Sequence, residues 1–151
     1  MLFRNLAKLI QWKNISGATV AGKNDTITAT AIDTLGFTDV LFAVTFGTIT
    51  ASGTGTIKIQ HSSDNGSSDA FADVAGSGYS YTAAVDSAKT VLVDVHAPLK
   101  RYLQLLIVRN NDQNAAIVAA NAILSNADLV PPALGDASAI KQLNGTVSGT
   151  A

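Results

Sequence analysis

The segment from Lys58 to Gly76, KIQHSSDNGSSDAFADVAG, concentrates the residue types that could perform chemistry, with three aspartates, an asparagine and a histidine. Its side chains with the hard oxygen atoms that calcium prefers are Asp64, Asn65, Asp69 and Asp73. An EF-hand loop needs a bidentate glutamate at its twelfth position. Counted from Asp64, that position is Ala75, so the EF-hand spacing is absent.

The same segment also has the composition of a turn. Asn65 and Gly66 stand among serines, and asparagine and glycine tolerate the positive φ that tight turns require. We therefore expect residues 62–69 to form a plain loop between two strands, with no metal bound. A cation site in this loop is the alternative.

Catalytic constellations are not evident elsewhere in the chain. His61 and His96 each end a predicted strand, where ordinary polar positions are expected; a metal site would need them paired, with carboxylates nearby. No serine lies in a G-x-S-x-G elbow, and P-loop and dinucleotide motifs are absent. All 11 acidic residues are aspartates, and two-carboxylate catalysis would need them to converge from separate loops. We expect a protein without enzymatic activity and without a cofactor, unless a histidine meets a carboxylate in a cleft.

Composition favours a β-protein of one domain. The chain has 151 residues, 47% of them hydrophobic and 14% charged. Threonine, valine and isoleucine are abundant and glutamate is absent, which favours strands over helices. The net charge of −1 with scattered basic residues argues against nucleic-acid binding, and no apolar run is long enough to cross a membrane. A surface this poor in charge is either covered by a partner or solvated by threonine, serine and asparagine.

Alternating apolar residues predict a series of strands. The clearest is 40–46, which places Val40, Phe42, Val44 and Phe46 on one face, with a bend or bulge at Gly47. The other predicted strands cover residues 26–34, 56–62, 89–98, 100–110 and 114–132, and residues 70–76 and 79–83 are expected as short strands or extended connections. The segment 114–132 is rich in alanine, and we interpret it as a strand because its neighbours are strands. The pattern predicts an all-β fold, a β-sandwich of jelly-roll or immunoglobulin-like topology.

Residues outside this region are expected to form two extensions. The predicted division is an N-terminal arm (1–25), a β-sandwich domain (26–132) and a C-terminal tail (133–151). In the arm, a helix would align Leu2, Leu6, Leu9 and Ile10, and residues 14–25 have the composition of a loop. We expect the arm to dock its apolar face on a neighbouring subunit.

The order of several segments resembles that of a group of tailed-phage structural proteins. DVLFAVTFGTIT is followed by GTIKIQHSSDNGSSDAFADVAG, by APLKRYLQLLIVRN and by an alanine-rich strand ending in LVPP. From about Asp39 to Pro132 this order resembles the capsid decoration, or cement, proteins of tailed bacteriophages. The resemblance implies a jelly-roll that forms homotrimers on the exterior of the virion, where each trimer clamps adjacent subunits of the major capsid protein.

On that interpretation the arm supplies contacts with the capsid shell or with a neighbouring trimer. Its candidate contact residues are Leu2, Phe3, Leu6, Ile10 and Trp12. The alternative for these side chains is packing against their own sandwich. Loss of the arm is expected to spare folding and to abolish capsid binding.

A different function remains open for a β-sandwich of this kind. A carbohydrate-binding or adhesin module of a phage fibre would expose aromatic rings, and Tyr79 and Tyr81 are its best candidates. Their spacing of two places both on one face of a strand. The favoured interpretation is that the two rings cover the edge of the sandwich.

Overall fold

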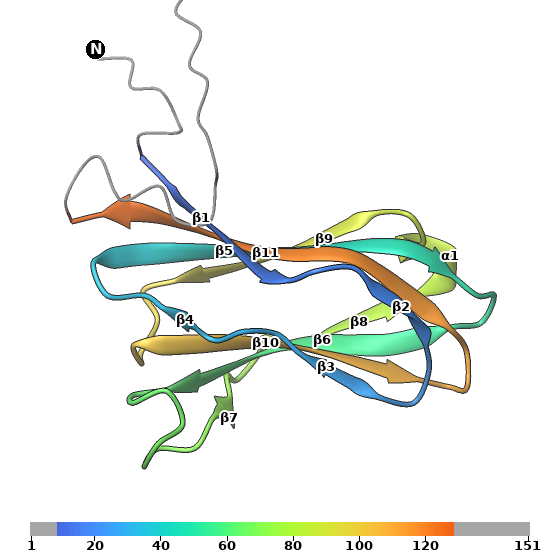
Figure 1. Cartoon of the computed structure of the whole chain (residues 1–151), viewed down its shortest axis with the longest axis horizontal. Coiled ribbons are helices and arrows are strands. Elements are labelled where there is room, and N and C mark those ends of the chain that lie inside the picture. Colours follow the sequence, from blue (N-terminus) through green and yellow to red (C-terminus); the bar gives the residue numbers. More distant parts are fainter. Residues whose placement is uncertain (1–8, 129–151) are drawn as a thin grey trace, which may run out of the picture.

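A computed structural model describes residues 9–128 as two antiparallel sheets packed face to face (Figure 1). The first sheet contains β1 (Gln11–Ser16), β2 (Thr19–Gly22), β5 (Phe37–Ile49), β9 (Thr90–His96) and β11 (Ala115–Ala127). The second contains β3 (Thr26–Thr28), β4 (Ile32–Asp33), β6 (Thr54–Ser62), β7 (Ala72–Asp73), β8 (Tyr79–Thr82) and β10 (Tyr102–Asn110). The predicted β-sandwich is confirmed.

The strand order identifies the sandwich as a jelly-roll. The first sheet has the order β1-β11-β5-β9, with β2 also paired to β11. The second has the order β3-β10-β6-β7, with β4 paired to β10 and β8 to β6. When β1/β2, β3/β4 and β7/β8 are each taken as one interrupted strand, the sandwich of residues 9–128 has eight strands. The first strand then pairs with the eighth, the second with the seventh, the third with the sixth and the fourth with the fifth. This rolled antiparallel ribbon is the jelly-roll arrangement, and it excludes the immunoglobulin-like alternative.

The core lies between the sheets and follows the alternation of the sequence. Val40, Phe42, Val44 and Phe46 all point inward from β5, as predicted, and each is at most 1% exposed. They face Ile57 and Ile59 of β6 and the inward residues of β10, which are Leu103, Leu105 and Ile107. Gly47 lies in the irregular part of the β5–β11 register, where three residues of β5 oppose two of β11, so the bulge expected there is confirmed.

The alanine-rich segment forms the long strand β11, as predicted, because its alanines complement the large side chains of β5. Ala122 is the register partner of Phe42, and Ala120 is the partner of Val44; both alanines are fully buried. A small residue opposite a large one keeps the two sheets at a uniform separation. The short α1 (Ala83–Asp86) is the helix of the described chain, and no helix within residues 9–128 is long and apolar enough to cross a membrane.

The predicted N-terminal arm differs from the structure. Residues 11–22, expected to be helix and loop, form β1 and β2, which pair with the edge of β11 that β5 leaves free. The alternation of apolar residues is weak in this segment, because only Ile15 of β1 is fully buried and Gly17 separates the two strands. Backbone pairing with β11, rather than apolar periodicity, determines this part of the fold. Residues 26–34, predicted as one strand, are divided into β3 and β4.

An ion pair between a buried arginine and a half-exposed aspartate, which the sequence did not predict, lies where the two sheets meet. Arg109 of β10 is 3% exposed, and its guanidinium contacts both carboxylate oxygens of Asp25. Its Nη1 also donates to the carbonyl oxygens of Val20 (2.9 Å) and Ala115 (2.8 Å) in the first sheet. Gly22 makes room for this group, because a Cβ there would lie 2.5 Å from Nη2 of Arg109. The hydrogen bond from Arg109 lowers the pKa of the Asp25 carboxyl.

The pairing of Arg109 predicts a large cost for removing Asp25. The substitution Asp25→Ala leaves a buried guanidinium without its counter-ion, and we expect the free energy of unfolding to fall by about 2 to 3 kcal/mol in urea denaturation at pH 7. Lys23→Ala is the matched control. It removes an exposed ion pair with Asp112 at 3.5 Å and should change stability by less than about 0.5 kcal/mol. Equal effects of the two substitutions would show that Arg109 does not depend on Asp25.

Candidate functional site

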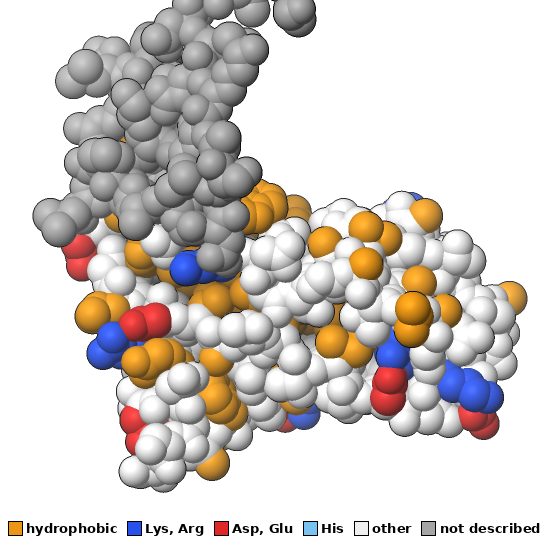
Figure 2. All heavy atoms as spheres, in the orientation of Figure 1, with side chains coloured by type: hydrophobic (Ala, Val, Ile, Leu, Met, Phe, Trp, Pro, Cys, Tyr) orange, Lys and Arg blue, Asp and Glu red, His pale blue; other side chains and the backbone are white. Residues whose placement is uncertain are grey.

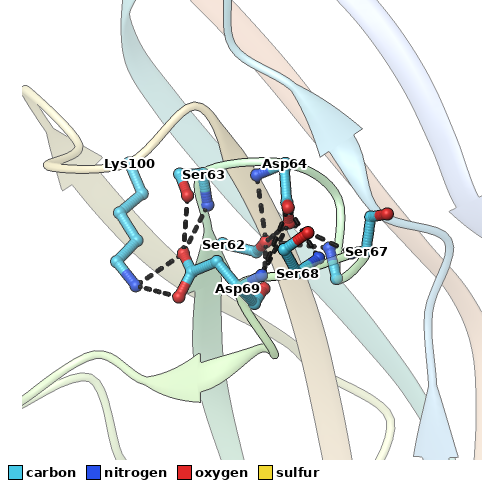
Figure 3. Close-up of polar contacts among 8 residues, drawn as sticks. Ser62, Ser63, Asp64, Ser67, Ser68, Asp69 and Lys100 are labelled. Carbon is cyan, nitrogen blue, oxygen red and sulfur yellow. Dashed lines mark hydrogen bonds and ion pairs between the residues drawn. The ribbon is translucent and has the colours of Figure 1, made fainter.

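The aspartate-rich segment forms a closed loop, as predicted, between β6 and β7 (Figure 3). Ser62, which is buried at the end of β6, anchors it. The Ser62 hydroxyl donates to the carbonyl oxygen of Asp69 at 2.6 Å and accepts from the backbone N–H of Gly66 at 2.8 Å. Asn65 and Gly66 both have positive φ, of 61° and 78°, as expected for a turn. We refer to residues 62–69 as the serine–aspartate loop.

The carboxylate of Asp64 binds the backbone of the serine–aspartate loop. It accepts hydrogen bonds from the backbone N–H groups of Ser67 (3.0 Å), Ser68 (2.6 Å) and Asp69 (3.1 Å). These bonds, led by the one from Ser68, lower the pKa of Asp64 because they stabilise the ionised carboxylate. Asp64 therefore acts as the acceptor that closes the loop.

Asp69 connects the same loop to the β9–β10 connection. Its carboxylate oxygens lie 2.9 and 2.8 Å from Nζ of Lys100, and one of them accepts from the Ser63 N–H at 2.7 Å. Together these bonds, the Lys100 bond first, lower the pKa of Asp69 to about 2. The next aspartate, Asp73, accepts from Lys58 (2.7 Å) and Gln60 (2.6 Å) on β6.

The aspartates that could have bound calcium are thus engaged with donors of the protein. A cation at the serine–aspartate loop would have to displace the Lys100 ammonium and several backbone N–H groups. Within residues 9–128, no group of three or more histidine or aspartate side chains is placed to hold a metal ion. The geometry supports a structural loop at this position.

The two histidines belong to different sheets. His61 is partly buried on β6, beside Leu103 and Ala72 in the register. His96, at the end of β9, is exposed, and its Nδ1 contacts the carboxylate of Asp39, which also accepts from the Asn126 amide at 2.6 Å. This histidine–carboxylate pair borders a hollow of about 470 Å³, but among the described residues no hydroxyl group bonds to His96. Within residues 9–128, the pair has no hydrogen-bonded nucleophile of the kind that completes a catalytic triad.

The two tyrosines do not form an aromatic platform. Tyr81 is fully buried, with its ring 4.6 Å from that of Phe46 and its hydroxyl donating to the carbonyl oxygen of Val108 at 3.2 Å. Burial raises the pKa of Tyr81 to about 12. Tyr79 is partly exposed and donates to the buried Asp86 carboxylate at 2.9 Å. The alternative in which both rings are presented to a sugar is therefore wrong, because β8 is a short edge strand whose second tyrosine enters the core.

Of the predicted arm contacts, Leu2, Phe3 and Leu6 lie outside the described residues. Ile10 is partly buried, and Trp12 is exposed on β1. Trp12 points away from the core, on the outer face of the first sheet, where its neighbours in register are Ile123 and then Leu41. The structure therefore places the tryptophan on the sandwich itself, in a strand.

A surface that the sequence did not predict lies at the end of the sandwich where β1 begins and β11 ends. We call it the terminal end; it comprises residues 34–38, 62–71 and 97–101, which are three loops with the strand ends next to them. Leu35 is 68% exposed and Leu99 is 92% exposed, and both line a hollow of about 380 Å³ together with Phe37 and Pro98. Figure 2 shows hydrophobic side chains among acidic and basic ones at this end, on the left. The leucines were not recognisable as surface residues because each stands in a short loop without periodicity.

Comparisons of the sequence and the structure with known proteins find little similarity. No protein-family model matches the chain, and no curated protein does. Among solved structures, the chain is similar to the PBSX exported protein XepA, with 17% sequence identity and a TM-score of 0.46. The similarity covers 99% of this chain and 46% of that one, so this chain spans less than half the length of XepA.

The bonds of Asp69 predict how the serine–aspartate loop responds to acid. Because its pKa is lowered in the folded protein, the stabilisation by Asp69 is present above the ordinary carboxyl pKa and is lost as the pH falls through about 2. The backbone amide resonance of Ser63 should therefore keep its position from pH 5 to pH 3 and shift near pH 2. In the Lys100→Met variant the midpoint should move to higher pH. An unchanged midpoint would mean that Lys100 does not contact Asp69 in solution.

Proposed function

We propose that this protein is a structural component of a phage virion, a capsid decoration protein that binds the exterior of the head through its terminal end. The proposed partner is the major capsid protein, and the proposed oligomer is a homotrimer. The observation that carries the proposal is the exposure of Leu35 and Leu99 at the end of the jelly-roll where both extensions of the chain are attached. The jelly-roll topology agrees with the sequence resemblance described above.

The surroundings of the two leucines are those of a binding surface. Arg101 pairs with Asp33 through two hydrogen bonds, of 2.8 and 2.6 Å, and Lys100 pairs with Asp69. Leu99 therefore precedes two cations, one paired with the serine–aspartate loop and the other with the end of β4. An apolar centre with charged groups at its border is the usual composition of a protein–protein interface. Leu35 and Leu99 line one hollow, so they form an apolar patch, and apolar patches at a surface mark binding sites more often than single exposed side chains do.

The described chain begins and ends beside this surface. Gln11 at the start of β1 is the register partner of Leu124 in β11, and the backbone N–H of Asp128 donates to Gly36 at 2.9 Å. Residues 1–8, which include Leu2, Phe3 and Leu6, are thus joined to the sandwich beside the Leu35 loop. Three copies of such a surface in a trimer would bind the shell by avidity, with only modest affinity needed from each copy.

Binding of the protein to undecorated heads tests the role of the two leucines. The double variant Leu35→Ser/Leu99→Ser should fold normally, because neither side chain is buried, and should bind purified undecorated heads at least about tenfold more weakly, as judged by co-sedimentation. Val85→Ser is the control, since Val85 is equally apolar and is 56% exposed on α1 at the opposite end. Full occupancy of heads by the double variant would contradict the proposed orientation.

Removal of residues 1–8 tests the arm separately. The deletion leaves β1 intact and is expected to keep the unfolding midpoint in urea while occupancy on heads falls. Deletion of residues 1–25 should instead destabilise the domain, because it removes β1, β2 and Asp25. Normal decoration by the shorter deletion would exclude Leu2, Phe3 and Leu6 from the contact with the shell.

A further inference from the structure

The four edges of the two sheets differ in regularity across residues 9–128. The edge formed by β1 and β2 is interrupted and contains a register shift between Asn14 and Ser16. Both edges of the second sheet are made of strands of two to four residues, β3 with β4 and β7 with β8. In contrast, β9 is seven residues long and pairs with β5 without a shift. Short or irregular strands are the ordinary protection of a sheet edge, and β9 lacks it.

The register shows which backbone groups of β9 are free. The backbone N–H of Phe46 donates to Lys89 (2.8 Å), and that of Ala97 donates to Thr38 (2.8 Å), so the bonded partners of β5 are the odd-numbered residues Val91, Val93 and Val95. The backbone N–H and C=O groups of Thr90, Leu92, Asp94 and His96 therefore point away from β5. In the described part of the chain, β9 has no second partner strand.

The surroundings of this edge leave room for another strand. The side of β9 away from β5 borders the hollow of about 470 Å³ between Leu92–His96 and Val74–Tyr79. Leu92 is 60% exposed on the outer face of the sheet. No proline or lysine stands within β9, although these are the residues that commonly block pairing at an edge.

The sequence of β9 is complementary to itself in one antiparallel register. When Leu92 of one copy lies opposite Leu92 of the other, Thr90 lies opposite Asp94, and their hydroxyl and carboxylate groups are matched for hydrogen bonding. On the inner side Val91 lies opposite Val93. A shift that places Asp94 opposite Asp94 brings two like charges together, and the intermediate shift places Asp94 against Leu92.

We propose that β9 is a self-association edge, at which two copies of this chain pair their β9 strands antiparallel with Leu92 opposite Leu92. The two first sheets then form one continuous sheet across a twofold axis. Such a contact is isologous, so it relates copies by a twofold axis and is distinct from the threefold contact of a trimer. It does not depend on the proposed binding of capsids; in a set of trimers it would connect one trimer to the next.

Single cysteine variants test the register, since the chain contains no cysteine. Opposed residues of a bonded antiparallel pair have Cα atoms about 5.5 Å apart, which suits a disulfide. Leu92→Cys should therefore give, after mild oxidation, a covalent pair of twice the 15.5 kDa chain mass under denaturing, non-reducing conditions. In Asp94→Cys the two sulfur-bearing residues are about 13 Å apart along the strands, and crosslinking should be at least about tenfold slower.

The association itself is tested by light scattering on the full-length protein over a range of concentrations. Leu92→Lys should lower the mass of the assembly, because it places two ammonium groups opposite each other. Val118→Lys, at an exposed valine of the central strand β11, should not. The proposal is overturned if Leu92→Cys and Asp94→Cys crosslink at the same rate, if neither crosslinks, or if the mass of the Leu92→Lys variant equals that of the parent protein.

Discussion

The pairing of β11 with both β5 and the β1/β2 segment is the constraint on which the rest of the structure depends. It joins the last strand of the ribbon to the first, so the roll closes only when residues about a hundred positions apart, such as Gln11 and Leu124, lie side by side. Closure in this way brings the beginning of β1 and the end of β11 to one end of the sandwich. It also leaves β9 at the opposite edge of the same sheet. The location of the terminal end and the exposure of the β9 edge thus have one cause.

The strands that pack on both sides of the core could be predicted from the sequence, and those held mainly by backbone pairing could not. Alternation located β5, β6, β9 and β10 because valine, isoleucine, leucine and phenylalanine recur at every second position, where they are buried or partly buried. In β1 and β2 the partly buried positions include a lysine, a threonine and a glycine, so hydrogen bonds to β11 fix the segment without an apolar pattern. Arg109 stands at an inward position that alternation would give to an apolar residue, and only the carboxylate of Asp25 and two carbonyl groups make that position tolerable.

The candidate surface was harder to predict than the fold, because it consists of loops. Leucine is usually a core residue, so the types of Leu35 and Leu99 give no sign that they are exposed. Their exposure follows from the β4–β5 and β9–β10 connections, which are too short for these side chains to reach the core. Conversely, the spacing of Tyr79 and Tyr81 indicated a shared face but not its environment. Tyr81 can be buried because the adjacent Gly55 has no side chain and so leaves room for the phenol ring.

The serine–aspartate loop is the richest concentration of polar groups in the sequence, and its position beside the β9–β10 connection explains what these groups do. Asp69 binds the ammonium of Lys100, and Asp33 binds the guanidinium of Arg101, so the two residues that follow Leu99 are tethered to the serine–aspartate loop and to the end of β4. Asp64 and Ser62 in turn keep Asp69 in place through the backbone of the loop. Ordering Leu99 before it meets a partner reduces the conformational entropy lost on binding. In the proposed decoration protein, these aspartates therefore support binding by holding an apolar side chain in position, and their oxygen atoms are used within the protein for that purpose.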